Sequence, residues 1–242
     1  MSDISSIRNE YRLSRLDVEN LDINPFNQFR FWLNDAMRAQ VAEPTAMALA
    51  TSTVEGKPSA RMVLLKDLDA DGFTFFTNYD SRKGKQLGVN PFAALVFFWP
   101  ELERQVRIEG KVTKTMRKVS DEYFNARPEG SRIGSWASPQ SQRIPGREYL
   151  ENLQQETVRL FQHKKLERPE NWGGYKLQPD LFEFWQGREN RLHDRFEYTW
   201  NGNMWEIHRL APRPTPCQGT PPPRQGGSRF ISSNGQCVLR WI

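Results

Sequence analysis

The first 212 residues of this chain contain no cysteine. The two cysteines, Cys217 and Cys237, lie close to the end of the sequence. A disulfide framework or a cysteine-based metal site therefore cannot support the main part of the chain. Histidine is also scarce, and His163, His193 and His208 show none of the spacings typical of paired zinc ligands. We therefore expect no metal site.

Long apolar runs are missing as well. No stretch approaches the roughly 18 residues that are needed to span a bilayer. Residues 1–11 are polar and charged, and they lack the apolar centre of a signal peptide. These features predict a soluble, cytoplasmic protein.

The positive charge of the chain is concentrated near its end. The net charge is +5, yet residues 1–212 carry 30 basic and 29 acidic residues, and residues 213–242 carry four arginines and no acid. Before residue 213 the basic residues alternate with acids instead of forming a polybasic block. A basic nucleic-acid-binding module, which would copurify with polynucleotide, is therefore a remote alternative.

The sequence predicts several helices. Asn24 and Pro25 indicate a helix start, because Asn caps a helix well and Pro suits its first position. This helix continues to about Gln40, and further helices are expected at residues 81–89, 116–126 and 147–163. In the first helix, the residues expected to face the core recur at helical spacing and are Phe26, Phe29, Leu33, Ala36 and Met37.

Between and after these helices, short apolar segments predict strands. Asn201-Gly202 is a strong signal for a hairpin turn. Because the strands follow one another without regular helical crossovers, we expect a β-rich α+β fold: an antiparallel barrel with peripheral helices. The expected strands are residues 45–51, 59–66, 73–78, 92–99, 104–113, 174–177, 181–187, 195–200 and 204–210.

The segment 213–242 differs in composition from the rest. It is rich in Pro and Gly and contains no acid, so it cannot bury enough apolar surface to offset the entropy of ordering. We expect a disordered, basic tail. Its last apolar residues leave one alternative, a short end segment that docks on the barrel.

A charged motif between residues 184 and 195 indicates a binding surface. On an extended backbone Arg191, His193 and Arg195 would share one face. Two guanidinium groups and an imidazole on one face suit an anionic ligand with polar ring substituents. The alternative is a charged edge strand that prevents aggregation.

Three further clusters are of a phosphate-binding type. Residues 61–66 form a strand with a cation at each end, residues 77–83 join a strand end to a helix start, and residues 123–131 combine Tyr, Arg and Ser. Each has an ordinary alternative, such as cations that extend from a strand to solvent, a solvated helix face or a core tyrosine. Their joint occurrence with the charged motif favours binding of phosphorylated ligands.

Together these motifs resemble the pyridoxine (pyridoxamine) 5′-phosphate oxidase family. The resemblance runs in order from Arg8 to Pro212 and is most specific in residues 184–195. It also includes residues 103–106, Gln140-Ser141 and Trp172-Gly173-Gly174. The resemblance implies an FMN-binding split β-barrel that works as a homodimer, with the flavin held between the subunits. It divides the chain into a flexible N-terminal segment at 1–20, an oxidase domain at 21–212 and the tail at 213–242.

The resemblance also implies which residues contact the cofactor FMN. One departure is Phe76, which stands where the family often has a tyrosine and removes a hydroxyl contact. The implied flavin contacts are Arg61, Met62, Val63, Leu64, Leu65, Lys66, Phe76, Thr77, Arg82, Lys83, Gln105, Gln140, Ser141, Trp185 and Arg195.

The implied substrate contacts form a second set. Arg8 and Tyr11 resemble a lid over the substrate, and Arg191 and His193 are the implied catalytic residues at the pyridine ring and its reacting carbon. Whether His193 transfers protons or only orients the substrate stays open. The full implied set is Arg8, Tyr11, Lys66, Tyr123, Arg127, Ser131, Arg191 and His193.

The implied activity is an FMN-dependent oxidation. Pyridoxamine 5′-phosphate and pyridoxine 5′-phosphate would be converted to pyridoxal 5′-phosphate, and dioxygen would be reduced to hydrogen peroxide. The alternative is another split-barrel flavin reductase or a non-catalytic FMN-binding protein. Such a protein would have no reason to carry the residue 123–131 cluster together with Arg191 and His193.

Removal of residues 213–242 should leave the fold, the flavin content and the turnover intact, because this segment lies beyond the region of resemblance. The measurement compares the thermal midpoint and the flavin retention of the full chain with those of a chain that ends at Pro212. A large loss of either in the shortened chain would show that the tail is structural.

Overall fold

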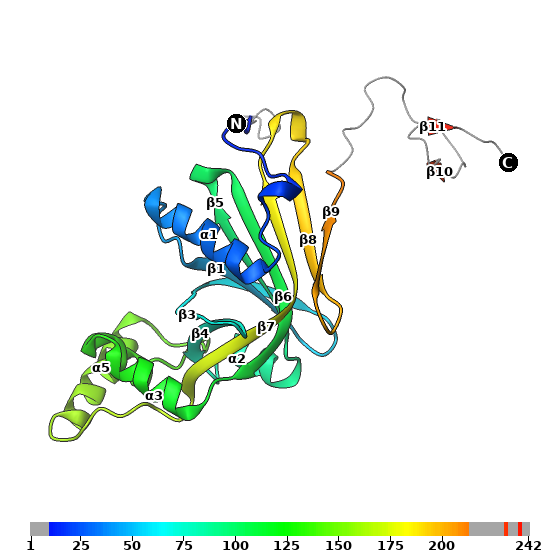
Figure 1. Ribbon diagram of the computed structural model, residues 1–242. Coiled ribbons are helices and arrows are strands. Elements are labelled where there is room, and N and C mark those ends of the chain that lie inside the picture. Colours follow the sequence, from blue (N-terminus) through cyan, green and yellow to red (C-terminus); the bar gives the residue numbers. More distant parts are fainter. Residues whose placement is uncertain (1–9, 213–229, 232–236, 239–242) are drawn as a thin grey trace, which may run out of the picture. The chain divides into compact units, whose positions relative to one another are not determined.

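A nine-stranded antiparallel sheet organises the main unit of the chain (Figure 1). This computed structural model describes residues 10–212, 230–231 and 237–238. The chain forms two units, residues 1–212 and 213–242. In the second unit β10 (Phe230–Ile231) pairs antiparallel with β11 (Cys237–Val238). The other tail residues, on which the expectation of disorder falls, lie outside the described residues, as does Arg8.

The elements follow one another in an order close to the expected one. The 3-10 helices are η2 (Val18–Asn20), η3 (Pro100–Leu102) and η4 (Glu189–Arg191). The α-helices are α1 (Pro25–Arg38), α2 (Arg82–Val89), α3 (Arg117–Ala126), α4 (Glu129–Ala137) and α5 (Arg147–Phe161). The strands of the large sheet are β1 (Ala46–Ser52), β2 (Pro58–Leu64), β3 (Asp67–Leu68), β4 (Phe73–Asn78), β5 (Phe92–Trp99), β6 (Arg104–Lys114), β7 (Trp172–Gln186), β8 (Asp194–Trp200) and β9 (Trp205–Arg209).

The sheet divides along β7. Its order is β2-β1-β5-β6-β7-β4-β3, and β8 pairs with both β7 and β9. The first part of β7, residues 172–177, pairs with β4, and its last part, residues 181–186, pairs with β8. Strand β6 runs along the other edge of β7 for its whole length. The antiparallel architecture with peripheral helices is therefore the expected one.

The prediction of two separate strands at 174–177 and 181–187 is wrong, because both belong to β7. Pro179 suggests a break, since proline cannot donate to a ladder. In the structure the register of β6 against β7 shifts between Glu109 and Gly110, opposite this proline. A side chain on Gly110 would collide with the backbone of Gln178 and Pro179. Glycine thus lets the two strands approach at a bulge, and β7 continues.

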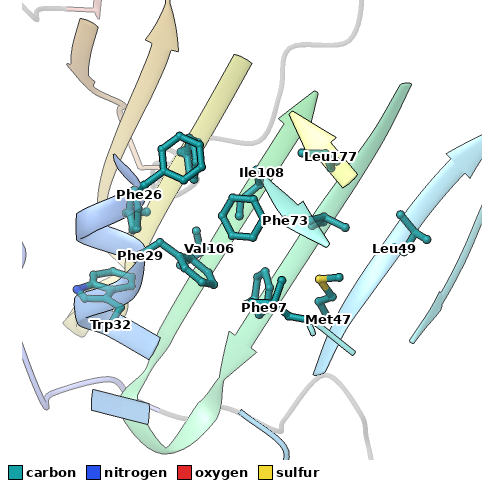
Figure 2. Close-up of a cluster of buried hydrophobic side chains, with 14 of the residues drawn as sticks. Phe26, Phe29, Trp32, Met47, Leu49, Phe73, Phe97, Val106, Ile108 and Leu177 are labelled. Atoms are coloured by element: carbon teal, nitrogen blue, oxygen red, sulfur yellow. The ribbon is translucent and has the colours of Figure 1, made fainter. Parts of the chain in front are cut away.

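Helix α1 supplies one side of the core. The Asn24 side chain accepts a hydrogen bond from the Phe26 N–H at 2.9 Å, which confirms the predicted cap. Phe29 lies edge-on against Phe73 and Phe97, and Figure 2 shows these rings among the buried residues of the sheet. The prediction that Met37 faces the core is wrong. It is 48% exposed, and Trp32 of the same helix is buried instead.

The sequence did not predict helix α4. Its residues include Gly130 and Gly134, which lower helix propensity and favoured a loop. The helix forms beside α5, and the Trp136 ring lies 5.0 Å from that of Phe161. Tertiary packing therefore decides the local structure here. None of the helices in the described part of the chain is long and apolar enough to cross a membrane.

Candidate functional site

Three cationic side chains meet where β4 leads into α2, and we call Arg61, Arg82 and Lys83 the basic cluster. The Ser81 side chain caps α2 by accepting from the Gly84 N–H, so the helix starts at Arg82. Lys83 Nζ donates to Thr77 Oγ1 at 3.0 Å and to Gln140 Oε1 at 3.1 Å. Four of the predicted flavin residues, Thr77, Arg82, Lys83 and Gln140, are thus gathered around one helix start.

Arg61 reaches the same region from β2. Its guanidinium donates to Leu49 O at 3.0 Å, Thr51 Oγ1 at 2.7 Å and Ser59 Oγ at 2.6 Å. These neutral partners fix its position without balancing its charge.

The electrostatics of the basic cluster favour an anion. Burial lowers the pKa of Lys83, and the charge of Arg61 lowers it further. Burial and the charge of Arg82 likewise lower the pKa of Arg61. Within residues 10–212 no carboxylate forms an ion pair with any of these three cations. Excess positive charge at a helix N-terminus is well suited to a phosphate.

A second group is built on an aromatic stack. Phe76 of β4 stacks on Tyr123 of α3, with ring centroids 3.9 Å apart, and on Trp172 of β7 at 5.6 Å. The Arg127 guanidinium lies 4.7 Å from the centroid of the Trp172 ring. Phe76 thus contributes an aromatic ring to this stack, and it offers no hydroxyl group.

Arg127 is fixed at the start of α4. Its Nη1 donates to Ser135 Oγ at 2.6 Å, and that hydroxyl donates to Ser131 O at 3.0 Å. Burial lowers the pKa of Arg127. The structure therefore brings Tyr123, Arg127 and Ser131 to one place, as the sequence motif predicts. Lys66, which is exposed, follows β2 and donates its N–H to Thr74 O at 2.9 Å.

A third group surrounds the loop between β7 and β8. The rings of Trp185 and His193 have centroids 4.6 Å apart, and Tyr11 lies edge-on to both at 5.6 and 5.7 Å. A side chain on Gly187 would come within 2.7 Å of the Tyr11 ring. Glycine at this position therefore lets the N-terminal segment lie over the loop.

His193 is held in one orientation. The Arg188 N–H donates to His193 Nδ1 at 3.1 Å. Burial lowers the pKa of His193, the charge of Arg191 lowers it further, and Asp194 opposes this effect. A neutral imidazole that accepts at Nδ1 carries its proton on Nε2. His193 therefore offers a hydrogen-bond donor on its free side.

The prediction that Arg191, His193 and Arg195 share one face of an extended strand is wrong. Glu189–Arg191 form the 3-10 helix η4, in which Asn190 and Arg191 have φ angles of 56° and 60°. These left-handed residues turn the chain, and β8 begins only at Asp194. Arg191 is exposed in this turn. Gly187 and Asn190 are the sequence signal for such a turn.

Three further predicted flavin residues share one row of the sheet. Gln105 of β6 lies opposite Trp185 of β7, which lies opposite Arg195 of β8. Their side chains leave the face opposite to the core, because the neighbouring residues Val106 and Phe184 are buried.

Strand β2 divides its predicted flavin residues between the two faces of the sheet. Met62 and Leu64 are exposed on the outer face, whereas Val63 packs against the core and Leu65 is buried. Ser141 is exposed and adopts a left-handed conformation with φ 69° next to Gln140.

Arg195 is part of an ion-pair network that the sequence analysis missed. Glu183 is 4% exposed and accepts from Arg195 Nε at 2.7 Å and from Arg107 Nη2 at 2.7 Å. Arg195 Nη1 also donates to Ala211 O at 3.0 Å. The available signal was a single acid within an otherwise apolar or aromatic strand segment, since such an acid needs a partner when buried.

Within one chain, the basic cluster and the aromatic stack lie far from the group around Trp185 and His193. Trp172 and Trp185 lie near opposite ends of β7, and 13 residues of strand extend about 40 Å. Figure 1 shows β7 running from α3 and α5 toward the loop that precedes β8. The basic cluster and the aromatic stack therefore lie far from Trp185 and His193 in the same chain.

The comparison with known families matches these motifs. A sequence profile described as pyridoxamine 5′-phosphate oxidase matches residues 33–159. The chain belongs to this family. A second profile, described as the pyridoxine 5′-phosphate oxidase C-terminal dimerisation region, matches residues 172–212, which cover β7 to β9. This second match supports a homodimer.

Individual relatives cover nearly the whole main unit. A Cyanothece protein named pyridoxine/pyridoxamine 5′-phosphate oxidase is 53% identical over 86% of this chain and 98% of the relative. A Paraburkholderia xenovorans protein of the same name is 51% identical over 88% of this chain and all of the relative. The resemblance and the expected class of enzyme, an oxidoreductase, are thereby confirmed.

Solved structures confirm the expected split-barrel fold. PhzG from Burkholderia lata, determined with tetrahydrophenazine-1-carboxylic acid, has a TM-score of 0.78 and 31% identity, over 84% of this chain and all of that one. An FMN-binding protein from Nostoc punctiforme, described as related to pyridoxamine 5′-phosphate oxidase, has a TM-score of 0.61 and 18% identity. The match covers 79% of this chain and all of the Nostoc protein.

Replacement of Glu183 by Gln should lower the free energy of unfolding by about 1.5–3 kcal/mol, because two partly exposed guanidinium groups lose charged hydrogen bonds to a buried carboxylate. Urea denaturation at pH 7 measures this effect. Glu109→Gln is the matched control, because Glu109 pairs with Arg107 on the exposed side of the network. It should cost at most about 1 kcal/mol. Equal effects of the two substitutions would contradict the assigned role of Glu183.

The difference in unfolding free energy between wild type and Glu183→Gln should also depend on pH. Burial alone would raise the pKa of Glu183, but the hydrogen bonds and charges of Arg195 and Arg107 outweigh it, so the pKa is lowered. The stabilisation is then fully present above the unfolded-state pKa and is lost as the pH falls through the folded-state value. The difference between wild type and Glu183→Gln should therefore shrink below about pH 4.

Proposed function

We propose that this protein oxidises pyridoxamine 5′-phosphate and pyridoxine 5′-phosphate to pyridoxal 5′-phosphate, with FMN as cofactor and dioxygen reduced to hydrogen peroxide. The family membership supports FMN as the cofactor. Two separate cationic sites carry the proposal, because the reaction needs one for the flavin phosphate and one for the substrate phosphate. The basic cluster provides the first site, and Arg127 beside Tyr123 provides the second.

The basic cluster fits the phosphate of FMN. Its cations lack carboxylate partners among the described residues, and Thr77 and Gln140 fix the Lys83 ammonium by hydrogen bonds. A bound phosphate would supply the missing negative charge and would relieve the repulsion between Arg61, Arg82 and Lys83. Gln105, Trp185 and Arg195 then provide polar and aromatic contacts for the isoalloxazine ring.

The aromatic stack and α4 hold the substrate phosphate. Arg127 offers a charged donor, and Tyr123, Ser131 and Lys66 offer further donors around it. Anchoring the phosphate fixes the position of the pyridine ring, and positioning of this kind can contribute several kcal/mol to catalysis.

The loop between β7 and β8 acts at the pyridine ring. His193 presents its Nε2–H and Arg191 its guanidinium to polar ring substituents, and Tyr11 covers the site and excludes water. Since the free nitrogen of neutral His193 carries a proton, this geometry favours orienting the substrate over accepting a proton from it. Bound FMN would supply the redox chemistry, as acceptor of the hydride from the 4′ carbon and donor of electrons to dioxygen. Water hydrolyses the imine formed from the amine substrate to the aldehyde and ammonia.

The length of β7 supports a site that is shared between two subunits. About 40 Å of strand separates the two ends of the site within one chain. In a homodimer, the basic cluster and the aromatic stack of one subunit can lie against Trp185, Arg195 and His193 of its partner. These residues of both subunits would then hold FMN at the interface, near the dimerisation region of residues 172–212.

Anaerobic reduction tests the proposed reaction. The purified protein should be yellow, with about one FMN per subunit, and pyridoxamine 5′-phosphate should bleach the flavin absorption in the absence of oxygen. Pyridoxal 5′-phosphate should already form as the flavin bleaches, and admission of oxygen should restore the colour and release hydrogen peroxide. Flavin that stays oxidised with excess substrate would contradict the proposal and would favour a non-catalytic FMN-binding protein.

Replacement of Arg127 by Ala should weaken the binding of pyridoxamine 5′-phosphate by roughly 1.5–3 kcal/mol, because a charged hydrogen bond to the phosphate is lost. The FMN content should not change. The preference for phosphorylated over unphosphorylated pyridoxamine, measured as a ratio of kcat/KM, should shrink accordingly. Arg117→Ala is the control on α3, since Arg117 is exposed and pairs with Glu170. An unchanged preference in Arg127→Ala would refute the phosphate assignment.

A further inference from the structure

The Asp194 carboxylate contacts three separate parts of the chain. Asp194 Oδ2 accepts from the Leu16 N–H at 3.2 Å and from Arg188 Nη1 at 3.1 Å. Asp194 Oδ1 accepts from Arg209 Nη1 at 2.9 Å. The side chain is only 13% exposed. One carboxylate at the start of β8 thus joins the N-terminal segment, the loop before β8 and strand β9.

The N-terminal segment, residues 10–17, is called the strap here. Two of its backbone amides donate to carboxylates of the barrel: Leu13 N–H to Glu103 Oε2 at 3.0 Å and Leu16 N–H to Asp194. The Leu16 side chain is buried, and Arg209 also bonds to the strap through Asp17 at 3.0 Å. The two amide bonds and the buried Leu16 set the position of Tyr11, which lies against Trp185 and His193, whereas the exposed Asp17–Arg209 pair contributes little.

The loop between β7 and β8 is also held by the Asp194 carboxylate. Arg188 binds Asp194 through its side chain and donates its backbone N–H to His193 Nδ1. Asp194 therefore acts on His193 through Arg188 and on Tyr11 through the strap. Both rings that meet over Trp185 are thus linked to this one side chain through neighbouring contacts.

We propose that Asp194 is a positioning residue that couples the strap to the loop carrying Arg191 and His193. A carboxylate is required because it accepts from a backbone amide and also balances two guanidinium groups in a largely buried place. An asparagine would turn a donor toward one of its three partners and would leave Arg188 and Arg209 without their shared counter-charge. The largely buried part of the coupling rests on these contacts, beside the exposed Arg12–Glu189 pair, and its effect on substrate binding rests on the proposed function.

Hydrogen exchange of the full-length holoprotein tests the coupling directly. In Asp194→Asn, amides in residues 10–17 and 187–193 should exchange at least about tenfold faster than in wild type, because charged hydrogen bonds are lost at both segments. Amides in β5 and β6 should keep their protection. Asp17→Asn is the matched control, since it removes one exposed ion pair to Arg209 and leaves the Leu16 and Arg188 contacts in place. Its exchange should stay within twofold of wild type.

Steady-state kinetics provide a second measurement. Asp194→Asn should raise the KM for pyridoxamine 5′-phosphate about tenfold while kcat changes less than threefold, and the FMN dissociation constant should stay the same. Asp17→Asn should leave all three values unchanged. A purely structural ion pair would instead lower the thermal midpoint without this selective change in KM.

The inference is overturned if strap exchange in Asp194→Asn stays within twofold of that in Asp17→Asn, or if protection is lost equally in β5 and β6. If Asp194→Asn does not fold, Arg188→Gln decides the question. This variant should speed exchange in residues 187–193 and leave the strap protected, and a loop that keeps wild-type exchange overturns the coupling. A wild-type protein that does not oxidise the substrate would refute the proposed function, while the exchange data would still decide the role of Asp194.

Discussion

The continuous pairing of β7 is the constraint on which the rest of this structure depends. This strand pairs with β6 along one edge and with β4 and then β8 along the other. Its first residues place Trp172 beside Phe76 and Tyr123, and its last residues place Trp185 beside His193. A break at Pro179 would separate these two ends, and Gly110 avoids the break by admitting a bulge. The spacing of the two ends is the basis of the proposed site shared by two subunits.

The charged side chains are arranged differently near the two ends of β7. Near Trp185 and His193, Glu183 and Asp194 each bind two arginines. Glu109 and Asp17 supply a second carboxylate to each network, so the cations are balanced and their geometry is fixed. In the basic cluster, Arg61 and Lys83 are held by neutral hydrogen-bond partners, and burial depresses their pKa values. Balanced pairs stabilise and orient, whereas an unbalanced cluster attracts an anion. This contrast is consistent with the proposed phosphate site at the basic cluster and the proposed orienting role of the loop between β7 and β8.

Local sequence signals predicted most of the elements. The Asn24 cap, the Asn201-Gly202 turn and the bounds of β4 and β5 agree with the structure, because each depends on neighbouring residues or on strand alternation. Helix α4 could not be predicted from its two glycines, since packing against α5 stabilises it. The partners of Glu183 could not be predicted from the sequence either, because Arg107 and Arg195 come from other strands and meet it only in the folded sheet.

The sequence by itself determined the residue types of the site, the antiparallel fold class and the family. Motifs and the alternation of apolar and polar residues depend only on which residues are neighbours along the chain. Only the tertiary structure decided where these motifs lie. It placed Arg191 in a left-handed turn before the strand, where the Arg188 N–H bonds to His193 and the Tyr11 ring packs over Gly187. It also separated the basic cluster and the aromatic stack from the loop between β7 and β8, because strand pairing and strand length fix distances that no local pattern contains.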